Sequence, residues 1–353
     1  MVSNSRKNLI YSLVLVVLIG AVYLYRNREA GPVEKQNNSP LSGWVNFSGQ
    51  TMGASYQVKF KTNRNENFQS KIDSIFTRVT LAFSSYEVNS EVNRFNLNDS
   101  LASPSADFLD MLVFSKDLNS KTFGAFEPTQ KPLENLWEFS KNGPFRKDST
   151  EIAFVMPSVG IQKVNVSDTL IRKSNSGTLL DFNPSAIGWA IEGVGNYLEK
   201  LGISDYWIQI GGQIRAHGLN ERGELWKAGI RYPNPGSGEA KEGALALENK
   251  TISPAGNWEA FYLNDSTRIS FTLDPRTGMP VRHGLLAAWA INANSKKADA
   301  LAEVLMILGP REAMKMDSMD TDLEMILIYN EKGSPFKIYA SPEIKPYLSF
   351  PIE

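Results

Sequence analysis

One stretch in the middle of the chain restricts the fold more than any other, because it combines an amphipathic helix with two strand-like flanks. Ser185 is a possible N-cap for this helix, and Gly202 follows it as a stop signal. Five apolar residues between them recur at alternating steps of four and three, the spacing of one helical face: Ile187, Ile191, Val194, Leu198 and Leu201. The sequence therefore predicts a helix over about 185–201.

The two flanks of this helix resemble strands. The segment before it, "TLLDFNPSAIGW", reads as a strand that delivers Asp181 into a turn. The segment after it, "YWIQIGGQIRAHG", reads as an apolar strand that opens into a glycine pair, Gly211 and Gly212. Strand, turn, helix and strand form a βαβ-like unit, although antiparallel pairing fits the same pattern.

The remaining elements mix helices and strands in an order that favours an α+β fold. Strand patterns occur at "SYQVKF", over 225–275, at "EMILIYN" and at "FKIYASP". Helical spacing is found at 69–83, around 105–122 with an end near Gly124, and at 295–309. A chain of 353 residues with 42% hydrophobic content can bury a large core. We expect mixed or antiparallel sheets with packed helices.

Composition excludes several functional classes. Cysteine is absent, so the chain has no disulfide, no thiolate metal site and no cysteine nucleophile. With only two histidines, any metal site must depend mainly on oxygen ligands, which favours a hard ion such as magnesium or calcium. The 37 basic and 38 acidic residues nearly cancel, so we expect no nucleic-acid partner.

The N-terminal region is predicted to be separate from the folded part. An uncharged run from Leu9 to Tyr25 reaches the lower length limit of a membrane-spanning helix. We interpret residues 1–28 as a membrane anchor in preference to a cleaved signal segment or a core helix, with the N-terminus in the cytoplasm. Residues 29–43 have the composition of a linker, and 44–353 form the predicted domain.

Eight blocks in a fixed order resemble the ApbE-type flavin transferases, which are FAD:protein FMN transferases. The blocks are "TMGASY", "SSYEVNSEVNRFN", "FGAFEPT", "LDFNPSAIGWAIEGV", "IQIGGQIRAHG", "SPAGNWEAFY", "LDPRTGMPVRHGLLAAW" and "ADALAEVLMILG". The resemblance runs from about Thr51 to about Pro342. It implies a two-part fold with FAD between the parts. It also implies magnesium-dependent transfer of FMN to a threonine or serine of an acceptor flavoprotein, at the inner membrane facing the periplasm.

The resemblance also implies a metal site. Asp299 matches the metal-binding aspartate of the family, and Glu303 lies four residues further on the same helical face. Relatives usually have threonine at the position of Glu303. The third ligand is a main-chain carbonyl that maps to Pro184, which keeps this oxygen. A solvated helix face is the alternative interpretation of the two acids.

The residues that the resemblance places against the cofactor are spread over the chain. They are Met52, Tyr86, Ala125, Phe126, Glu127, Asp181, Ile187 and Leu273. Asp274, in the stiff "DPRTGMP" loop, is the catalytic candidate. Met52 and Phe126 could instead be ordinary core residues, Asp181 could be a helix cap, and Arg276 could form a structural salt bridge in place of a phosphate contact.

Several site positions depart from the family pattern. Ile187 stands where relatives carry a polar or charged residue, and Phe271 stands where they carry a histidine before the Asp-Pro motif. Pro254 and Lys297 each replace a threonine. We therefore keep three hypotheses, with the transferase first, a non-catalytic FAD-binding scaffold second, and an enzyme that hydrolyses FAD to FMN and AMP third.

Overall fold

The computed structural model describes residues 43–137, 149–233, 240–256, 261–264, 267–319, 322–330 and 337–349. These residues belong to one compact unit, Gly43–Glu353. The predicted anchor at 1–28, and the linker apart from Gly43, lie outside the described ranges. Within those ranges, no helix has both the length and the apolar character needed to cross a bilayer.

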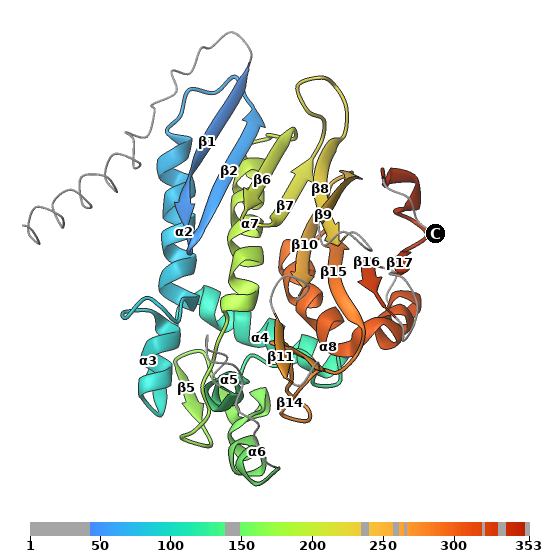
Figure 1. The fold of residues 1–353 in the computed structure, drawn as a ribbon. Helices are drawn as coiled ribbons and strands as arrows, with labels where there is room; N and C mark the ends of the chain where they lie inside the picture. Colours follow the sequence, from blue (N-terminus) through green and yellow to red (C-terminus); the bar gives the residue numbers. More distant parts are fainter. Residues whose placement is uncertain are drawn as a thin grey trace, which may run out of the picture. The chain divides into compact units, whose positions relative to one another are not determined.

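An eight-stranded antiparallel sheet forms the centre of the described unit (Figure 1). Antiparallel pairing along the whole sheet resolves the alternative that the sequence left open, so the βαβ-like interpretation is wrong. In spatial order the strands are β1 (Trp44–Thr51), β2 (Ala54–Lys61), β6 (Tyr206–Ile210), β7 (Gln213–His217), β10 (Lys250–Gly256), β15 (Leu285–Asn292), β16 (Glu324–Tyr329) and β17 (Lys337–Ala340).

Helices and a hairpin cover the two faces of this sheet. α2 (Phe68–Phe83), α4 (Ala106–Lys121) and α7 (Asn183–Lys200) share one hydrophobic core with β2 and β6. α8 (Ser295–Met319) packs on one face of β15 and β16. The hairpin of β8 (Trp226–Pro233) and β9 (Ala240–Leu247) shares a core with their other face. Alternate residues of β15 enter these two cores, which explains why this strand is apolar throughout.

Shorter elements complete the fold. The short helices are α3 (Glu91–Leu97), α5 (Lys131–Trp137), α6 (Ser149–Val155) and the 3₁₀ turns at Met156–Ser158, Ile161–Lys163 and Lys345–Tyr347. The short strands are β3 (Ser100–Ala102), β4 (Val164–Val166), β5 (Leu170–Lys173), β11 (Phe261–Asn264), β12 (Thr267–Ser270), β13 (Leu273–Asp274) and β14 (Met279–Pro280). α5 and α6 pack with Leu273 in a small core of their own.

The predicted middle helix is confirmed as α7, with two corrections at its start. It begins at Asn183 with a proline in its first turn, so Ser185 lies inside the helix and does not cap it. The segment before it is not a strand. The side-chain amide of Asn96 donates to the Leu180 carbonyl and accepts from the Leu180 amide, both at 2.8 Å. These two hydrogen bonds replace those that a neighbouring strand would make. Gly202, with φ of 75°, ends the helix as predicted.

α7 and α8 approach each other closely at Gly188. A Cβ atom at this position would lie 2.5 Å from the Ser295 carbonyl oxygen and 2.6 Å from the Asp299 Cβ. Only glycine fits there without displacing α8. The predicted end of α8 at Gly309 is a kink, with φ of 77° followed by Pro310, after which the helix continues. The crossing at Gly188 fixes Asp299 beside the first turns of α7.

Candidate functional site

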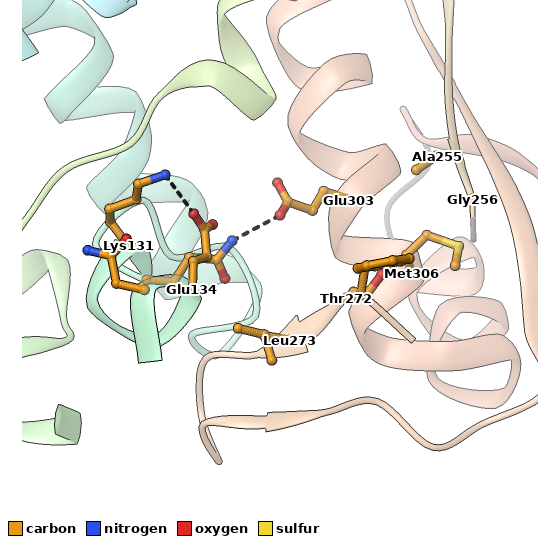
Figure 2. Close-up of a pocket in the computed structure, with 11 residues that line it drawn as sticks. Lys131, Glu134, Ala255, Gly256, Thr272, Leu273, Glu303 and Met306 are labelled. Carbon is orange, nitrogen blue, oxygen red and sulfur yellow. Dashed lines mark hydrogen bonds and ion pairs between the residues drawn. The ribbon is translucent and has the colours of Figure 1, made fainter. Parts of the chain in front are cut away.

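A cavity of about 510 Å³ opens between α5, the end of β10, the β13 segment and α8 (Figure 2). Its volume lies within the range of small-molecule sites. One wall is apolar and includes Phe271, Leu273 and Met306, and the opposite wall is polar. The polar lining residues are Gln130, Lys131, Glu134, Asn135, Thr272 and Glu303, and Thr272, Ala255 and Gly256 lie beside Met306 (Figure 2).

Asp299 is the most buried acid near this cavity, with 4% of its surface exposed. Its Oδ2 accepts a hydrogen bond of 2.6 Å from the Gly188 amide, and its Oδ1 accepts one from the side chain of Gln213. Ser253 lies 3.4 Å from the same Oδ1. Burial, reinforced by the charge of Glu303, outweighs these hydrogen bonds and raises the pKa of Asp299 to about 7.

Glu303 lies one turn further along α8, where it borders the cavity. Gln130 Nε2 donates to Glu303 Oε1 over 3.2 Å. Burial, and then the charge of Glu134, raise the pKa of Glu303 to about 7. Asp299 and Glu303 therefore lie one turn apart on α8, as their spacing predicted. Ionising both acids costs free energy, because burial and nearby negative charge raise both pKa values.

Each of these acids is held by a glutamine amide, and each glutamine leaves its own carbonyl oxygen unpaired. Gln213 Oε1 and Gln130 Oε1 are buried and accept no hydrogen bond from the described residues. An unpaired buried oxygen costs free energy unless a ligand satisfies it. The site thus contains two carboxyl groups and two amide oxygens with unused capacity to bind a cation.

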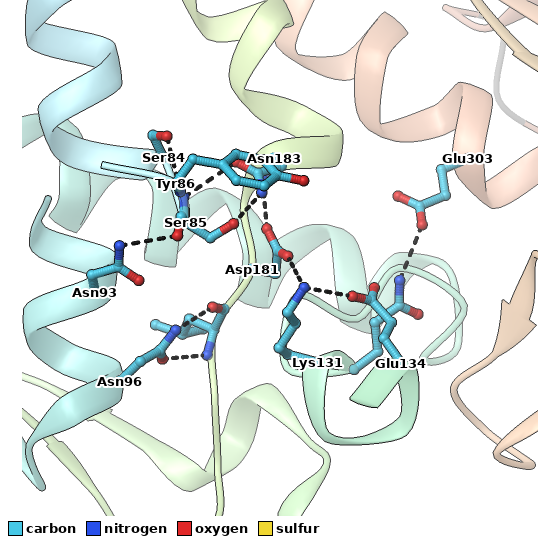
Figure 3. A network of polar contacts seen from close by, with 12 residues as sticks. Ser84, Ser85, Tyr86, Asn93, Asn96, Lys131, Glu134, Asp181, Asn183 and Glu303 are labelled. Atoms are coloured by element: carbon cyan, nitrogen blue, oxygen red, sulfur yellow. Dashed lines mark hydrogen bonds and ion pairs between the residues drawn. The ribbon is translucent and has the colours of Figure 1, made fainter. Parts of the chain in front are cut away.

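A second group of charges faces α8 from the other side of the cavity (Figure 3). Lys131 Nζ lies 3.0 Å from Asp181 Oδ2 and 3.1 Å from Glu134 Oε2. Partial burial opposes the charge of Lys131, but these carboxylates outweigh it and raise its pKa to about 12. Burial, followed by the charge of Asp181, raises the pKa of Glu134. Among the described residues that line the cavity, Lys131 is the one cationic side chain.

Asp181 organises the turn into α7 although Phe182 is the N-cap residue, and the predicted contact of Asp181 with the cofactor stays a prediction. Its Oδ1 accepts the Asn183 amide at 2.9 Å and so organises the turn into α7. Its Oδ2 pairs with Lys131. The side chain is 7% exposed and its backbone amide binds the Pro128 carbonyl at 2.8 Å, so the carboxylate is held rigidly beside the cavity.

Pro184 lies in the first turn of α7, four residues before Gly188. Helix geometry directs its carbonyl toward the Gly188 amide, which also contacts Asp299. Asp299 therefore lies beside the first turns of α7, whereas the hydrogen bond of Glu303 is with Gln130, and a shared metal site of Pro184, Asp299 and Glu303 stays a prediction. Among the described residues, no three acidic or histidine side chains converge on one point, so main-chain and amide oxygens would have to complete a metal site.

Three of the predicted flavin contacts lie on one side of the fold. Met52 and Gly53 form the turn between β1 and β2, with φ of 51° and 77°, which fits a two-residue hairpin. Met52 and Ile187 are partly buried against the core of α2 and α7. Tyr86, in the loop after α2, is 88% exposed and leaves its ring free to stack on a ligand.

The segment Ala125–Glu127 is buried, and none of its side chains lines the described cavity. Glu127 accepts hydrogen bonds from the backbone and hydroxyl of Thr129, at 2.9 and 2.6 Å, and from Asn119 and the Ile161 amide, both at 3.1 Å. Burial raises its pKa despite these donors. Glu127 therefore organises its loop, and a cofactor contact by these three residues stays a prediction.

The "DPRTGMP" loop is held by its own side chains. Arg276 binds both oxygens of the Asp274 carboxylate, each at 2.8 Å, and the Asp274 carbonyl accepts the Gly278 amide at 2.8 Å. Of the two roles predicted for Arg276, the structure shows the salt bridge. Asp274 is the predicted catalytic residue, and its carboxylate is occupied by this pair. Leu273 and Phe271 line the cavity, and the predicted contact of Leu273 with the cofactor stays a prediction.

Sequence reasoning missed four residues that shape the site: Gln130, Lys131, Glu134 and Gln213. The first three lie within five residues after the "FGAFEPT" block, which the resemblance places against the cofactor. Their closeness to this block is the feature of the sequence that could have indicated their place in the site. A charged pair three residues apart on a short helix is otherwise typical of any solvated surface. Gln213 was visible as the residue after the glycine pair, but its contact with α8 depends on tertiary packing.

The fold and the cavity define an α+β protein with a cavity of small-molecule size that is bordered by Glu303, one turn from the buried Asp299. The ApbE family profile matches residues 52–327. A curated relative from Haemophilus influenzae, named FAD:protein FMN transferase, is 30% identical over 82% of this chain and 88% of its own length. One from Vibrio cholerae, with the same name, is 29% identical over 86% of this chain and 93% of its own length.

Solved structures agree with these relatives. The flavin transferase ApbE from Vibrio cholerae superposes with a TM-score of 0.75 at 27% identity and covers 86% of this chain and 99% of its own. The apo flavinyl transferase ApbE of Pseudomonas stutzeri gives a TM-score of 0.76 at 25% identity, with 88% and 98% covered. The chain belongs to the ApbE family.

Proposed function

We propose that this chain is an FAD:protein FMN transferase that moves the FMN part of FAD to a threonine or serine of a partner flavoprotein. The observation that carries the proposal is a pair of acids one turn apart on α8: Glu303 lines a cavity of small-molecule size, and the buried Asp299 accepts a hydrogen bond from the first turns of α7. Relatives with the FAD:protein FMN transferase name match over most of this chain.

The proposed reaction exchanges one phosphate bond for another. The acceptor hydroxyl oxygen attacks the phosphorus on the FMN side of FAD and forms a phosphoester. The bond from this phosphorus to the AMP phosphate oxygen breaks, and AMP leaves with the electron pair. The hydroxyl proton is released. Catalysis of such a transfer depends mainly on positioning and on stabilising negative charge.

The residues near α8 fit a hard divalent cation such as Mg²⁺. Asp299, Glu303 and the Pro184 carbonyl would hold it, and the unpaired carbonyl oxygens of Gln130 and Gln213 add donors of the same type. When bound, the ion supplies positive charge that offsets the charge of the diphosphate and of the leaving AMP. The raised pKa values of both acids also fit this assignment, because no cationic side chain pairs with them among the described residues.

The chain's own side chains perform the remaining tasks. Phe271, Leu273 and Met306 form an apolar wall that excludes water from one side of the cavity. Asp181 is fixed by the turn into α7 and orients Lys131 toward the cavity. The exposed ring of Tyr86 would stack on the flavin, and Met52 would support it from the β1–β2 turn.

A transfer assay tests the proposal. The purified full chain is incubated with FAD, Mg²⁺ and a flavin-acceptor domain, and the products are separated under denaturing conditions. A fluorescent covalent adduct together with one equivalent of AMP is the expected result. Free FMN and AMP without an adduct would mean hydrolysis, and FAD recovered intact would mean that the chain binds without turnover.

Binding without turnover is the second candidate function, and one observation favours it. Phe271 lines the cavity wall, and the nearby Asp274 carboxylate is paired with Arg276, so this wall carries no free proton acceptor. In that case the chain would be a scaffold that holds FAD. The same assay, run with Mn²⁺ and at pH 6 to 9, would then yield no AMP under any condition.

We also propose that residues 9–25 anchor the chain in the inner membrane, with the domain in the periplasm. The uncharged run in the sequence supports this placement. Fractionation of cells, followed by protease treatment of spheroplasts, tests it. The domain should sediment with membranes and be cleaved in spheroplasts, whereas a soluble or protected domain would contradict the proposal.

A further inference from the structure

The charges around the cavity are unbalanced in a way that singles out Lys131. Four carboxyl groups influence one another there. The charge of Asp181 raises the pKa of Glu134, and the charge of Glu134 raises that of Glu303. The charge of Glu303 in turn raises the pKa of Asp299. One ammonium group, that of Lys131, stands among them. Such a wall repels a dinucleotide diphosphate unless cations offset it.

Other lysines near α8 have partners away from the cavity. Lys296 Nζ lies over the Trp189 ring, 3.4 Å from its centroid. Lys297 Nζ lies 4.0 Å from the Asp322 carboxylate. Neither of them lines the cavity. Among the residues that the structure describes, Lys131 is therefore the cation that lines this space.

The position of Lys131 leaves part of its side chain exposed at the cavity. Its side chain is 32% exposed and borders the cavity, whereas its partner Asp181 is 7% exposed (Figures 2 and 3). Glu134, the other partner, is 28% exposed. A partly hydrated ion pair of this kind contributes little stability, so exchanging a carboxylate for a phosphate oxygen costs little.

We propose that Lys131 binds the diphosphate of FAD, exchanging its contact with Glu134 for phosphate oxygens while Asp181 continues to orient it. This inference rests on the proposed function, because it takes FAD as the ligand of the cavity. Lysine is well suited to the task, since its ammonium is a flexible point charge with three donors. Glu134 then competes with the ligand and keeps the lysine in place when FAD is absent.

Two substitutions of opposite sign test the proposal. The Kd values of FAD and of riboflavin, which lacks the diphosphate, are measured by quenching of flavin fluorescence with the full chain in EDTA and in Mg²⁺. K131M should raise the Kd of FAD about tenfold or more and leave that of riboflavin within about twofold. K131R should stay near wild type. E134Q should lower the Kd of FAD several-fold, because it removes the competing charge.

K121M is the matched control, because it removes a lysine whose partner Asp117 lies on the exposed face of α4. It should leave both Kd values unchanged, and thermal unfolding verifies that every variant is folded. An unchanged Kd of FAD in K131M would overturn the proposal. The proposal would also be overturned if K131M and E134Q each weakened the binding of FAD and of riboflavin equally. That result is expected when the pair of Lys131 and Glu134 only supports the fold and does not contact the diphosphate.

The outcomes also separate this inference from the proposed function. If the wild-type chain forms the covalent flavin adduct but K131M binds FAD normally, the role of Lys131 is wrong and the transferase proposal stands. If the wild-type chain does not bind FAD, the proposed function fails and the role of Lys131 fails with it.

Discussion

Two buried polar clusters lie along the same pair of helices, α7 and α8, and they differ in how completely their groups are paired. In the first, Arg215 binds Glu192 at 2.6 Å, Glu199 at 2.9 Å, the Tyr206 hydroxyl at 2.9 Å and the Ser295 hydroxyl at 3.2 Å. In the second, around Asp299 and Glu303, two acids face neutral amides whose carbonyl oxygens have no partner.

The difference separates a structural cluster from a binding site. Arg215 is 8% exposed, and its guanidinium pairs with two carboxylates at hydrogen-bond distance. Such a cluster is complete without a ligand. On our proposal, the cluster around Asp299 would be completed by a cation bound to its acids and by the diphosphate of FAD in the cavity. We therefore expect changes in the first cluster to affect stability, and changes in the second to affect binding and turnover.

The largest expected effect belongs to Asp299. D299N should lower the transfer rate by roughly a hundredfold to a thousandfold, because it removes a charge that holds the cation. It should not lower the free energy of unfolding, since Gln213 can turn its unpaired oxygen toward the new amide. Adduct formation and urea unfolding measure the two effects. A variant that unfolds while keeping its activity per folded molecule would break the comparison.

The next effect concerns the paired cluster. R215M should lower the free energy of unfolding by about 3 to 5 kcal/mol, because it leaves the largely buried Glu192 without its cation and also breaks the pair with the more exposed Glu199. The Kd of FAD at a temperature where the variant is folded should change by less than about twofold. A loss of FAD binding without a loss of stability would mean that the cluster around Arg215 takes part in FAD binding and is not structural.

The third effect is a pH dependence. The pKa of Asp299 is raised to about 7 in the folded protein from a value of 3.8, so folding is favoured while this acid keeps its proton. This contribution is complete below pH 4 and is lost as the pH rises through 7. In EDTA, the unfolding free energy of wild type relative to D299N should fall by about 2 to 3 kcal/mol between pH 5 and pH 8. A constant or rising difference would contradict the raised pKa.

The smallest effect concerns Gln130, which holds Glu303 through its amide. Q130M keeps the length of the side chain and removes the amide. It should weaken Mg²⁺ binding about tenfold, because groups that orient metal ligands commonly contribute this much. Its free energy of unfolding should change by less than about 1 kcal/mol. Calorimetric titration with Mg²⁺ gives the affinity, and an unchanged value would remove Gln130 from the site.

Local patterns predicted the elements of this fold better than their connections. The helical spacing at 69–83 predicted α2, and the apolar run before the glycine pair at 211 and 212 predicted the strand β6. The strand predicted before α7 failed because the side chain of Asn96, far away in sequence, satisfies the Leu180 backbone. The start of α7 was misplaced because a proline in the first turn needs no side-chain cap.

The candidate site was predictable where chemistry and spacing coincide. Asp299 and Glu303 share a helical face because they are four residues apart, and that follows from the helix alone. The contacts of Lys131 with Asp181, and of Gln213 with Asp299, span 50 and 86 residues and arise only from packing. The pairing of Asp274 with Arg276 shows the same limit, since the sequence could not decide between phosphate and carboxylate as partner.

A structure of the chain with FAD and Mn²⁺, in which anomalous scattering locates the metal, tests the account most directly. We predict a metal peak at coordination distance from Asp299, Glu303 and the Pro184 carbonyl, with the diphosphate lying between this metal and Lys131. A metal bound elsewhere, or a diphosphate outside the cavity lined by Phe271 and Glu303, would contradict the account.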